Sequence, residues 1–518
     1  MIIASFKKYF ILSIVIIILF ATILAPSYFQ YAGSYSTPSV INGITIFENG
    51  HLVDSSALYQ GRLASDLDIE ESYPPPSILT AILIAISGLP YNKIAFIPIA
   101  GLGSLLFFIL ARYILPDKRS NYTLILAAAY FVLNVSTRFH TMITGREPIG
   151  VILLILFIIS YLKLLESPGS KIFPWLITCL LTTIAAGMTY YTTALAIIVI
   201  VIISFVTPQN KFSSGHPRGS AILILAILLF ITPPVVAREA SFLHLQNFFG
   251  NILGSILERL GAEGSKLNEN YLASDPISQV RLWGLRIVLF LSVISTAIII
   301  FRGIINPEER KSRQWLYAVI VIGVCSTELA YLLKDSIIST RFIVAFGSLC
   351  PLILMCKFDG NKRKILTVAI VSLMMIVSFT NINFHLNGES GGVKPYGIEK
   401  VQPVTDYIAH NIPNGTIAAD AGYSSNIWLM QIHNNSKINV FPIGRDALSL
   451  KDAQNGLVEP LNEVIKHRKL NYLLLNTDMP FFGDVWGYSV ILHRDHLESL
   501  PFDSIYDNGR FVLYKTGL

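Results

Sequence analysis

The chain has 518 residues, of which 53% are hydrophobic and only 14% are charged, and its mean hydropathy is +0.58. Soluble globular domains carry about 25% charged residues, so this composition excludes an ordinary soluble protein. The net charge of +6 comes from loops on one side of the predicted membrane region and gives no indication of nucleic-acid binding. The four cysteines lie in or beside apolar segments without metal-ligand spacing, so we expect buried thiols.

Apolar segments of the kind that cross a hydrocarbon core recur along the first three quarters of the chain and predict about eleven transmembrane helices. The first follows Lys7 and Lys8 and lacks a good signal-peptidase site behind it, so we expect an uncleaved helix. The clearest segments are 9–25, 151–165, 190–206, 219–236, 285–301, 315–333, 342–356 and 365–380.

The distribution of charge gives these helices a direction. With a cytoplasmic N-terminus and alternating spans, six short cytoplasmic segments together hold 17 basic and 5 acidic residues. A basic excess in short loops marks the cytoplasmic side of a membrane protein. The acidic loop 28–73 and the C-terminal region are therefore predicted outside the cell. The six predicted cytoplasmic segments are 1–8, 112–119, 163–171, 207–218, 302–313 and 357–364.

The segment 75–90 is apolar but short, and it lies between a run of prolines from Pro74 and the sequence Gly88-Leu89-Pro90. A stretch of this length is more often interfacial than spanning. We predict a helix lying in the outer membrane interface, an interpretation that also keeps the basic segment 112–119 on the cytoplasmic side.

The composition changes near residue 393, where apolar runs shorten and turn residues become regular. Residues 397–411 have helical spacing, and a second helix is expected within 452–467. Strands are expected at 416–420, 438–442 and 471–476, and Asn508-Gly509 indicates a hairpin within 504–514. We predict a transmembrane domain over 1–392 and an extracytoplasmic α/β domain over 393–518.

The first outer loop is strongly acidic, and Arg62, its single basic residue, is a candidate substrate-binding side chain. A carboxylate here can act as a general base that takes a proton from an acceptor hydroxyl when a lipid-carried sugar is attacked. Asp54 begins a stretch with helical spacing, where helix capping is the alternative role. The acids of the loop are Glu48, Asp54, Asp66, Asp68, Glu70 and Glu71.

The next polar break, 134–148, concentrates Arg138, His140, Arg146 and Glu147 on the same predicted side. Charges that flank helices often only mark the interface, which is the alternative for Arg138 and His140. Arg146 and Glu147 stand directly before an apolar run. There a guanidinium can hold a phosphate, and a carboxylate can position an acceptor or a divalent ion.

Aromatic and basic side chains supply the remaining candidates for substrate binding. Tyr190 and Tyr191 lie at the predicted outer turn 187–193, where they either anchor the helices in the interface or contact a sugar or phosphate. Arg341 opens a later span from the outer side and either extends to the headgroup region or binds a lipid phosphate.

The order of these parts resembles the GT-C superfamily of integral-membrane glycosyltransferases, which includes protein O-mannosyltransferases and bacterial aminoarabinose transferases that modify lipid A. The resemblance covers residues 1–382 in architecture. The parts that carry it are an acid early in a long outer loop, Tyr73-Pro74-Pro75, Gly88, the basic hairpin Arg112–Arg119, Glu147, a Gly-x-Thr-Tyr-Tyr turn, the Arg341-Phe342 helix start and an outer C-terminal domain.

The resemblance implies transfer of a sugar from a polyprenyl-phosphate donor to a protein or lipid acceptor at the outer face. By position it implies Asp54 as the base, with Asp66 and Asp68 as rivals, and Glu147 as the second acid. Arg146 or Arg341 would hold the donor phosphate. A divalent metal ion such as Mg²⁺ or Mn²⁺ is left open. The Trp-Trp-Asp signature of oligosaccharyltransferases is absent, which disfavours transfer of a whole oligosaccharide to asparagine.

Two other functions stay open at this point. A transporter or lipid flippase predicts ionisable residues buried within the spans, and these are rare here, with Glu328 as the main exception. A non-catalytic scaffold that displays the C-terminal domain predicts that Asp54, Glu147 and Arg341 do not converge.

Overall fold

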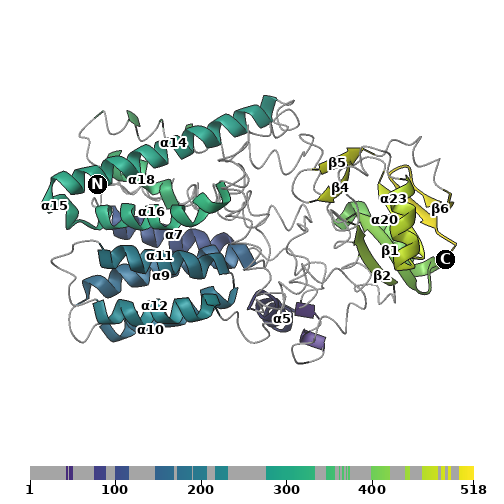
Figure 1. Ribbon diagram of the computed structural model, residues 1–518, viewed down its shortest axis with the longest axis horizontal. Helices are drawn as coiled ribbons and strands as arrows, with labels where there is room; N and C mark the ends of the chain where they lie inside the picture. The colour runs from purple at the N-terminus through teal and green to yellow at the C-terminus, as the bar shows by residue number, and fades with distance from the viewer. Residues whose placement is uncertain are drawn as a thin grey trace, which may run out of the picture.

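The computed structural model describes a membrane region and a C-terminal α/β region, and the statements below concern the described residues alone (Figure 1). These residues are 43–44, 46–48, 50, 75–88, 100–115, 146–167, 172–189, 191–206, 216–231, 276–332, 346–355, 361, 365–366, 369, 372–373, 398–420, 427, 438–443, 458–476, 480–484, 488–491 and 501–517.

The membrane region is a bundle of helices that run side by side (Figure 1). α9 packs on α7 and α10, α11 packs on α12 and α16, and α14 packs on α16 and α18. A single cluster of buried apolar side chains joins them. The bundle helices are α7 (Ala100–Ile114), α9 (Arg146–Glu166), α10 (Ile172–Thr189), α11 (Tyr191–Val206), α12 (His216–Ile231), α14 (Pro276–Ile305), α16 (Arg313–Leu332) and α18 (Leu349–Met355).

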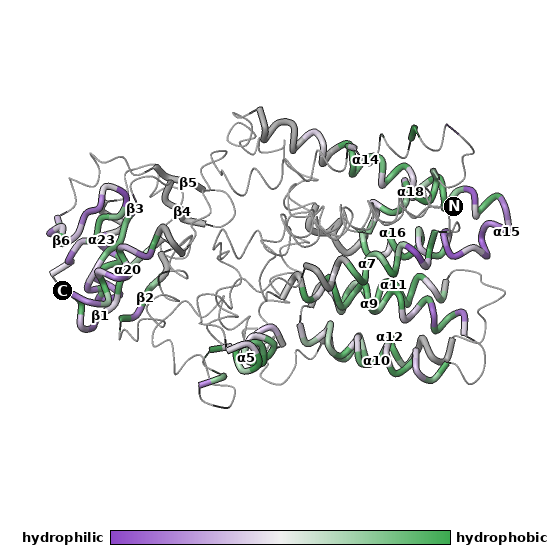
Figure 2. Tube along the Cα trace, turned by 180° about the vertical axis from the view of Figure 1, so that it is seen from behind, coloured by the Kyte–Doolittle hydropathy of each residue, from purple (hydrophilic) through white to green (hydrophobic). Residues whose placement is uncertain are grey.

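The surface of this bundle suits a lipid environment. Large apolar side chains such as Leu181, Phe290 and Phe301 are at least 60% exposed, and Figure 2 shows hydrophobic residues along most of each helix. A water-soluble monomer rarely exposes so much apolar surface. Within the described residues, three helical stretches are long and apolar enough to cross a membrane, namely Ile149–Glu166, Ile172–Thr189 and Ile287–Ile305. The total of about eleven spans stays a prediction.

Polar side chains inside the bundle satisfy their hydrogen bonds locally or between helices, as hydrocarbon surroundings require. Thr183 donates to the Cys179 carbonyl at 2.7 Å, one turn earlier in α10. Tyr317 donates to the Phe346 carbonyl at 2.8 Å, which ties α16 to the helical residues just before α18. Such interhelical hydrogen bonds help to hold membrane helices together where apolar burial gives little preference between protein and lipid.

The predicted interfacial segment is a helix, α5 (Pro75–Ser87). Gly88 ends it with a φ of +62° and donates its N–H to the Ile84 carbonyl at 3.1 Å, a conformation that favours glycine. α5 contacts α9 and α10. Figure 1 shows α5 nearly end-on while the bundle helices run across the page. This crosswise direction supports the interfacial placement, since a spanning helix would run with the bundle.

The C-terminal region contains a five-stranded sheet in the order β2-β1-β3-β7-β6. β2, β1 and β3 are parallel, and β7 runs antiparallel to both of its neighbours, β3 and β6. The helices, strands and hairpin predicted here are all present, and the short antiparallel pair β4 (Pro480–Asp484) and β5 (Tyr488–Ile491) was not predicted. The elements are α20 (Ile398–Asn411), β1 (Gly415–Asp420), β2 (Ile438–Ile443), α23 (Val458–Arg468), β3 (Tyr472–Asn476), β6 (Asp503–Asp507) and β7 (Phe511–Lys515).

Local chemistry explains these elements. Val401, Val404 and Ile408 form the buried stripe of α20 that packs on the sheet. In the hairpin, Gly509 has a φ of +80°, and the Asn508 side chain accepts the Phe511 N–H at 2.7 Å. The domain boundary predicted at 392/393 falls outside the described residues and stays a prediction.

One glycine in α14 offers a direct test of packing. A Cβ at Gly303 would lie 2.0 Å from Trp315 Cδ1, and the Trp315 indole N–H donates to the Ile300 carbonyl at 3.2 Å. Gly303→Ala should displace the indole and lower the free energy of unfolding by about 1–3 kcal/mol. Thermal unfolding in detergent measures this, with Ile304→Ala, an exposed neighbour, as the control. Equal melting temperatures for both variants would contradict the packing.

Candidate functional site

Helix α9 connects the two ends of the bundle and therefore separates two groups of polar residues. It begins at Arg146 and ends at Glu166. Its first turn contains Glu147 and Pro148. An acidic residue and a proline are both favourable at a helix N-terminus. Its last turn contains Lys163. The start of α9 at Arg146 agrees with the apolar run that the sequence places directly after Arg146 and Glu147.

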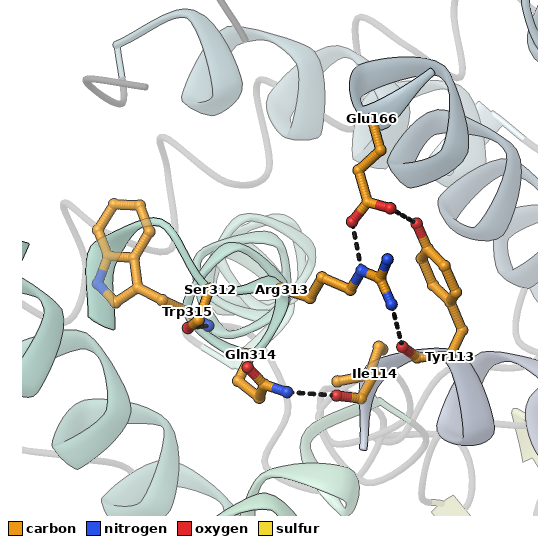
Figure 3. Close-up of polar contacts among 7 residues, drawn as sticks. All are labelled: Tyr113, Ile114, Glu166, Ser312, Arg313, Gln314 and Trp315. Atoms are coloured by element: carbon orange, nitrogen blue, oxygen red, sulfur yellow. Dashed lines mark hydrogen bonds and ion pairs between the residues drawn. The ribbon is translucent and has the colours of Figure 1, made fainter. Parts of the chain in front are cut away.

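At the far end, Glu166 joins three segments that are distant in the sequence (Figure 3). Arg313 Nε donates to Glu166 Oε1 at 2.5 Å, and the Tyr113 hydroxyl donates to Glu166 Oε2. Gln314 Nε2 donates to the Ile114 carbonyl at 2.6 Å beside them. The carboxylate of α9 thus fastens the end of α7 to the start of α16. We name Tyr113, Glu166 and Arg313 the clasp.

The aromatic ring of the clasp is also held by two cations. Lys163 Nζ lies 4.2 Å and Arg313 Cζ lies 4.4 Å from the Tyr113 ring centroid. Such cation–π contacts add about 0.5–1 kcal/mol each at exposed positions. Ser312 fixes the start of α16 by accepting the Trp315 N–H at 3.2 Å. This arrangement is a structural joint, since its charges and hydroxyl are engaged with one another.

The clasp also bears on topology. It joins parts of 112–119, 163–171 and 302–313, three segments predicted on the cytoplasmic side from their charge alone. The short helix α15 (Pro307–Arg310) lies at this end, and Arg310 donates to the Gly303 and Ile304 carbonyls at 2.9 Å. The structure thus brings the three basic segments to one end of the bundle, as a common side of the membrane requires.

The end of the bundle opposite the clasp holds those candidate catalytic and substrate-binding residues that the structure describes. α9, α10 and α11 alternate in direction, so the start of α9, the end of α10 and the start of α11 lie together. Arg146, Glu147 and Tyr191 open α9 and α11 at this end. Thr193 donates to the Ala186 carbonyl at 3.3 Å, which braces the predicted turn 187–193. Figure 1 shows α5 and the C-terminal sheet on this side, away from α15.

The remaining candidates lie outside the described residues, and their roles stay predictions. They are Asp54, Asp66, Asp68, Arg62, Arg138, His140, Tyr190 and Arg341.

The possible divalent metal ion stays a prediction. In the part of the chain that the structure describes, no three His, Cys, Asp or Glu side chains gather as metal ligands would. Cys179 and Cys350 are buried and Cys325 is partly buried, all as free thiols, which agrees with the expectation for these three.

Two arrangements escaped the sequence reasoning. The clasp is one, because residues 113, 166 and 313 share no local pattern, although their positions at helix ends beside basic residues are visible in the sequence. The other is the packing of Gly43 against α5, described below, for which the sequence gives no signal beyond the glycine itself.

The solved structures that are similar to this chain include two proteins named AftD and ArnT. The arabinofuranosyltransferase AftD from Mycobacteria superposes with a TM-score of 0.50 and 14% identity, over 99% of this chain and 40% of AftD. ArnT from Cupriavidus metallidurans, solved with undecaprenyl phosphate, gives a TM-score of 0.50 and 11% identity over 99% of this chain and 98% of ArnT. Searches against protein-family models and curated proteins give no match.

These comparisons concern the fold. At 14% and 11% identity the likeness shows a shared fold, which confirms the architecture expected from the sequence. The chain spans less than half of AftD but nearly the whole of ArnT. It is a mainly helical membrane protein with this fold.

Proposed function

We propose that the chain is a membrane glycosyltransferase that moves one sugar from a polyprenyl-phosphate donor to an acceptor at the outer face of the membrane. The observation that carries the proposal is the shared fold with ArnT over 99% of this chain and 98% of that protein, whose structure holds undecaprenyl phosphate.

The proposed reaction is an inverting displacement at the anomeric carbon. The acceptor oxygen forms a bond to this carbon as the bond to the phosphate oxygen breaks, and polyprenyl phosphate leaves with the bonding electrons. Asp54 takes the proton of the acceptor hydroxyl. Negative charge grows on the departing phosphate, and Arg146 or Arg341 stabilises it by charge-assisted hydrogen bonds.

Glu147 completes the proposed site. It stands next to Arg146 at the start of α9, at the end of the bundle opposite the clasp. From there its carboxylate orients the acceptor, or binds Mg²⁺ or Mn²⁺ together with other oxygen ligands if the reaction uses a metal. Tyr190 and Tyr191 supply faces on which a sugar ring stacks. Arg62, Arg138 and His140 are further contacts for the anionic donor.

The transporter alternative is disfavoured by what the bundle buries. Among the residues whose side chains the structure describes, a set that does not include Glu328, the buried polar ones are serines, threonines and one asparagine, with no buried Asp, Glu, Lys, Arg or His. A translocation pathway for a charged headgroup or a coupling ion needs such groups within the spans.

The test of the proposed function is turnover by the purified full chain in proteoliposomes. Undecaprenyl phosphate carrying a pentose, an aminopentose or a hexose is supplied with peptide and lipid acceptors, in the presence of Mg²⁺ and separately with EDTA. Release of free undecaprenyl phosphate with a glycosylated acceptor is the expected result. Movement of intact donor across the bilayer, without loss of its sugar, would support the flippase alternative and contradict the proposal.

A further inference from the structure

The residues before the acidic carboxylates pack tightly on α5. Gly43 and Ile44 are buried, and a Cβ built on Gly43 would lie 2.5 Å from Thr80 Cβ, 2.6 Å from Thr80 Cγ2 and 2.9 Å from the Ser77 carbonyl oxygen. Carbon atoms do not approach so closely without displacement. Glycine at position 43 is therefore a steric requirement of this contact, in which the Gly43 backbone lies against the Thr80 side chain and the Ser77 carbonyl.

This contact joins the part of the acidic loop 28–73 that precedes 51–74 to the helix that follows the loop. The helical residues 46–48 end at Gly50, which has a φ of +72° and donates its N–H to the Ile46 carbonyl at 2.8 Å. The described chain resumes at Pro75, the first residue of α5. Figure 1 shows the short purple pieces of 43–48 beside α5. The segment 51–74 is thus bounded by two elements that pack against each other, as in loops whose ends are close together.

One face of α5 contacts Gly43, and another face carries apolar side chains. Thr80, whose hydroxyl donates to the Pro76 carbonyl at 2.9 Å, is fully buried. Ile78, Ile82 and Ile86 follow at intervals of four and are 36%, 47% and 80% exposed. An apolar stripe of this kind on a crosswise helix suits the membrane interface. α5 also contacts α9, the helix that begins with Arg146 and Glu147.

We infer that Gly43 and Thr80 are positioning residues whose contact fixes the residues before Asp54 against α5, the helix that also contacts α9. The inference rests on the proposed function, which places the base in this loop. Asp54 follows Gly50 by only four residues, so its Cα lies within about 14 Å of that of Gly50. Loosening the contact at Gly43 would let the base move away from the donor.

The activity test uses Gly43→Ala in the full chain. The added methyl should separate residue 43 from α5 and lower kcat for sugar transfer by about 10–100-fold, because small misplacements of a catalytic group have effects of this size. KM for the donor should change less than kcat, because Arg62 is the single proposed donor contact that lies in this loop. The double variant Gly43→Ala/Thr80→Gly removes both side-chain clashes and should recover part of kcat. Wild-type kcat in Gly43→Ala would overturn the inference.

The matched control is Ser77→Ala on the same face of α5. Ser77 is 2% exposed, and its hydroxyl has no hydrogen-bond partner among the residues that the structure describes. Removing it leaves the Ser77 carbonyl and the packing in place, so we expect wild-type kcat. The melting temperature of the bundle should be unchanged in all these variants, because the large core cluster of the bundle contains no residue of α5.

A second readout does not depend on catalysis. Arg62 is the single trypsin site within 51–74, and cleavage there yields fragments of 62 and 456 residues. Gly43→Ala should accelerate this cleavage, and Ser77→Ala should not. If Asp54→Asn remains active while Gly43→Ala speeds cleavage, the proposed general base is wrong and the positioning role of Gly43 and Thr80 is supported. If Asp54→Asn is inactive while Gly43→Ala behaves as wild type in both assays, the positioning role of Gly43 and Thr80 is wrong.

Discussion

Asp54→Asn is expected to lower kcat for sugar transfer by about 10²–10⁴-fold, the range typical for loss of a general base. Asparagine keeps the size and polarity of aspartate but does not accept the acceptor's proton at neutral pH. Donor binding should persist, because the phosphate contacts are assigned to arginines. Binding of labelled undecaprenyl phosphate to the variant, measured beside turnover, separates a lost base from a misfolded protein.

The rival carboxylates provide the controls for this prediction. Asp66→Asn and Asp68→Asn should leave kcat close to that of the wild type if Asp54 is the base. An active Asp54→Asn together with one inactive rival variant would move the base to that rival. Activity retained in all three variants would exclude a base among these aspartates and refute the mechanism proposed above.

The fold could be predicted where local patterns carry it. The stripe of Val401, Val404 and Ile408 predicts α20 because helical periodicity places all three on one face. Asn508-Gly509 predicts the hairpin because this turn requires a positive φ. The pair β4 and β5 escaped because 480–491 contains no such two-residue turn, and Phe482 and Asp484 flank an irregularity in the pairing.

The site was predictable only in part, for a related reason. Pro148 after Arg146 and Glu147 marks a helix start, and the structure places α9 there. Contacts between distant segments follow from tertiary packing, which no sequence period encodes. The clasp and the Gly43–Thr80 contact are of this kind: each depends on how two helices meet, and a glycine or glutamate in the sequence fits many roles.

The two ends of α9 lead to the second large prediction, a contrast between Arg146→Gln and Arg313→Gln. At the proposed catalytic end, Arg146→Gln should raise KM for the lipid-linked donor by about 10–100-fold, because hydrogen bonds to a charged group contribute about 1.5–3 kcal/mol. Its effect on the melting temperature should be small. Donor titrations in proteoliposomes at fixed acceptor concentration give KM for both variants.

Arg313→Gln should behave in the opposite way. It removes the ion pair to Glu166 and one cation–π contact to Tyr113. The Arg313 side chain is 48% exposed, so the loss in unfolding free energy should be only about 1 kcal/mol. KM should be unchanged, because the clasp lies at the other end of the bundle. A raised KM in Arg313→Gln and an unchanged KM in Arg146→Gln would place donor binding at the clasp end and reverse the orientation argued from the charges. An unchanged KM in both would transfer the phosphate contact to Arg341.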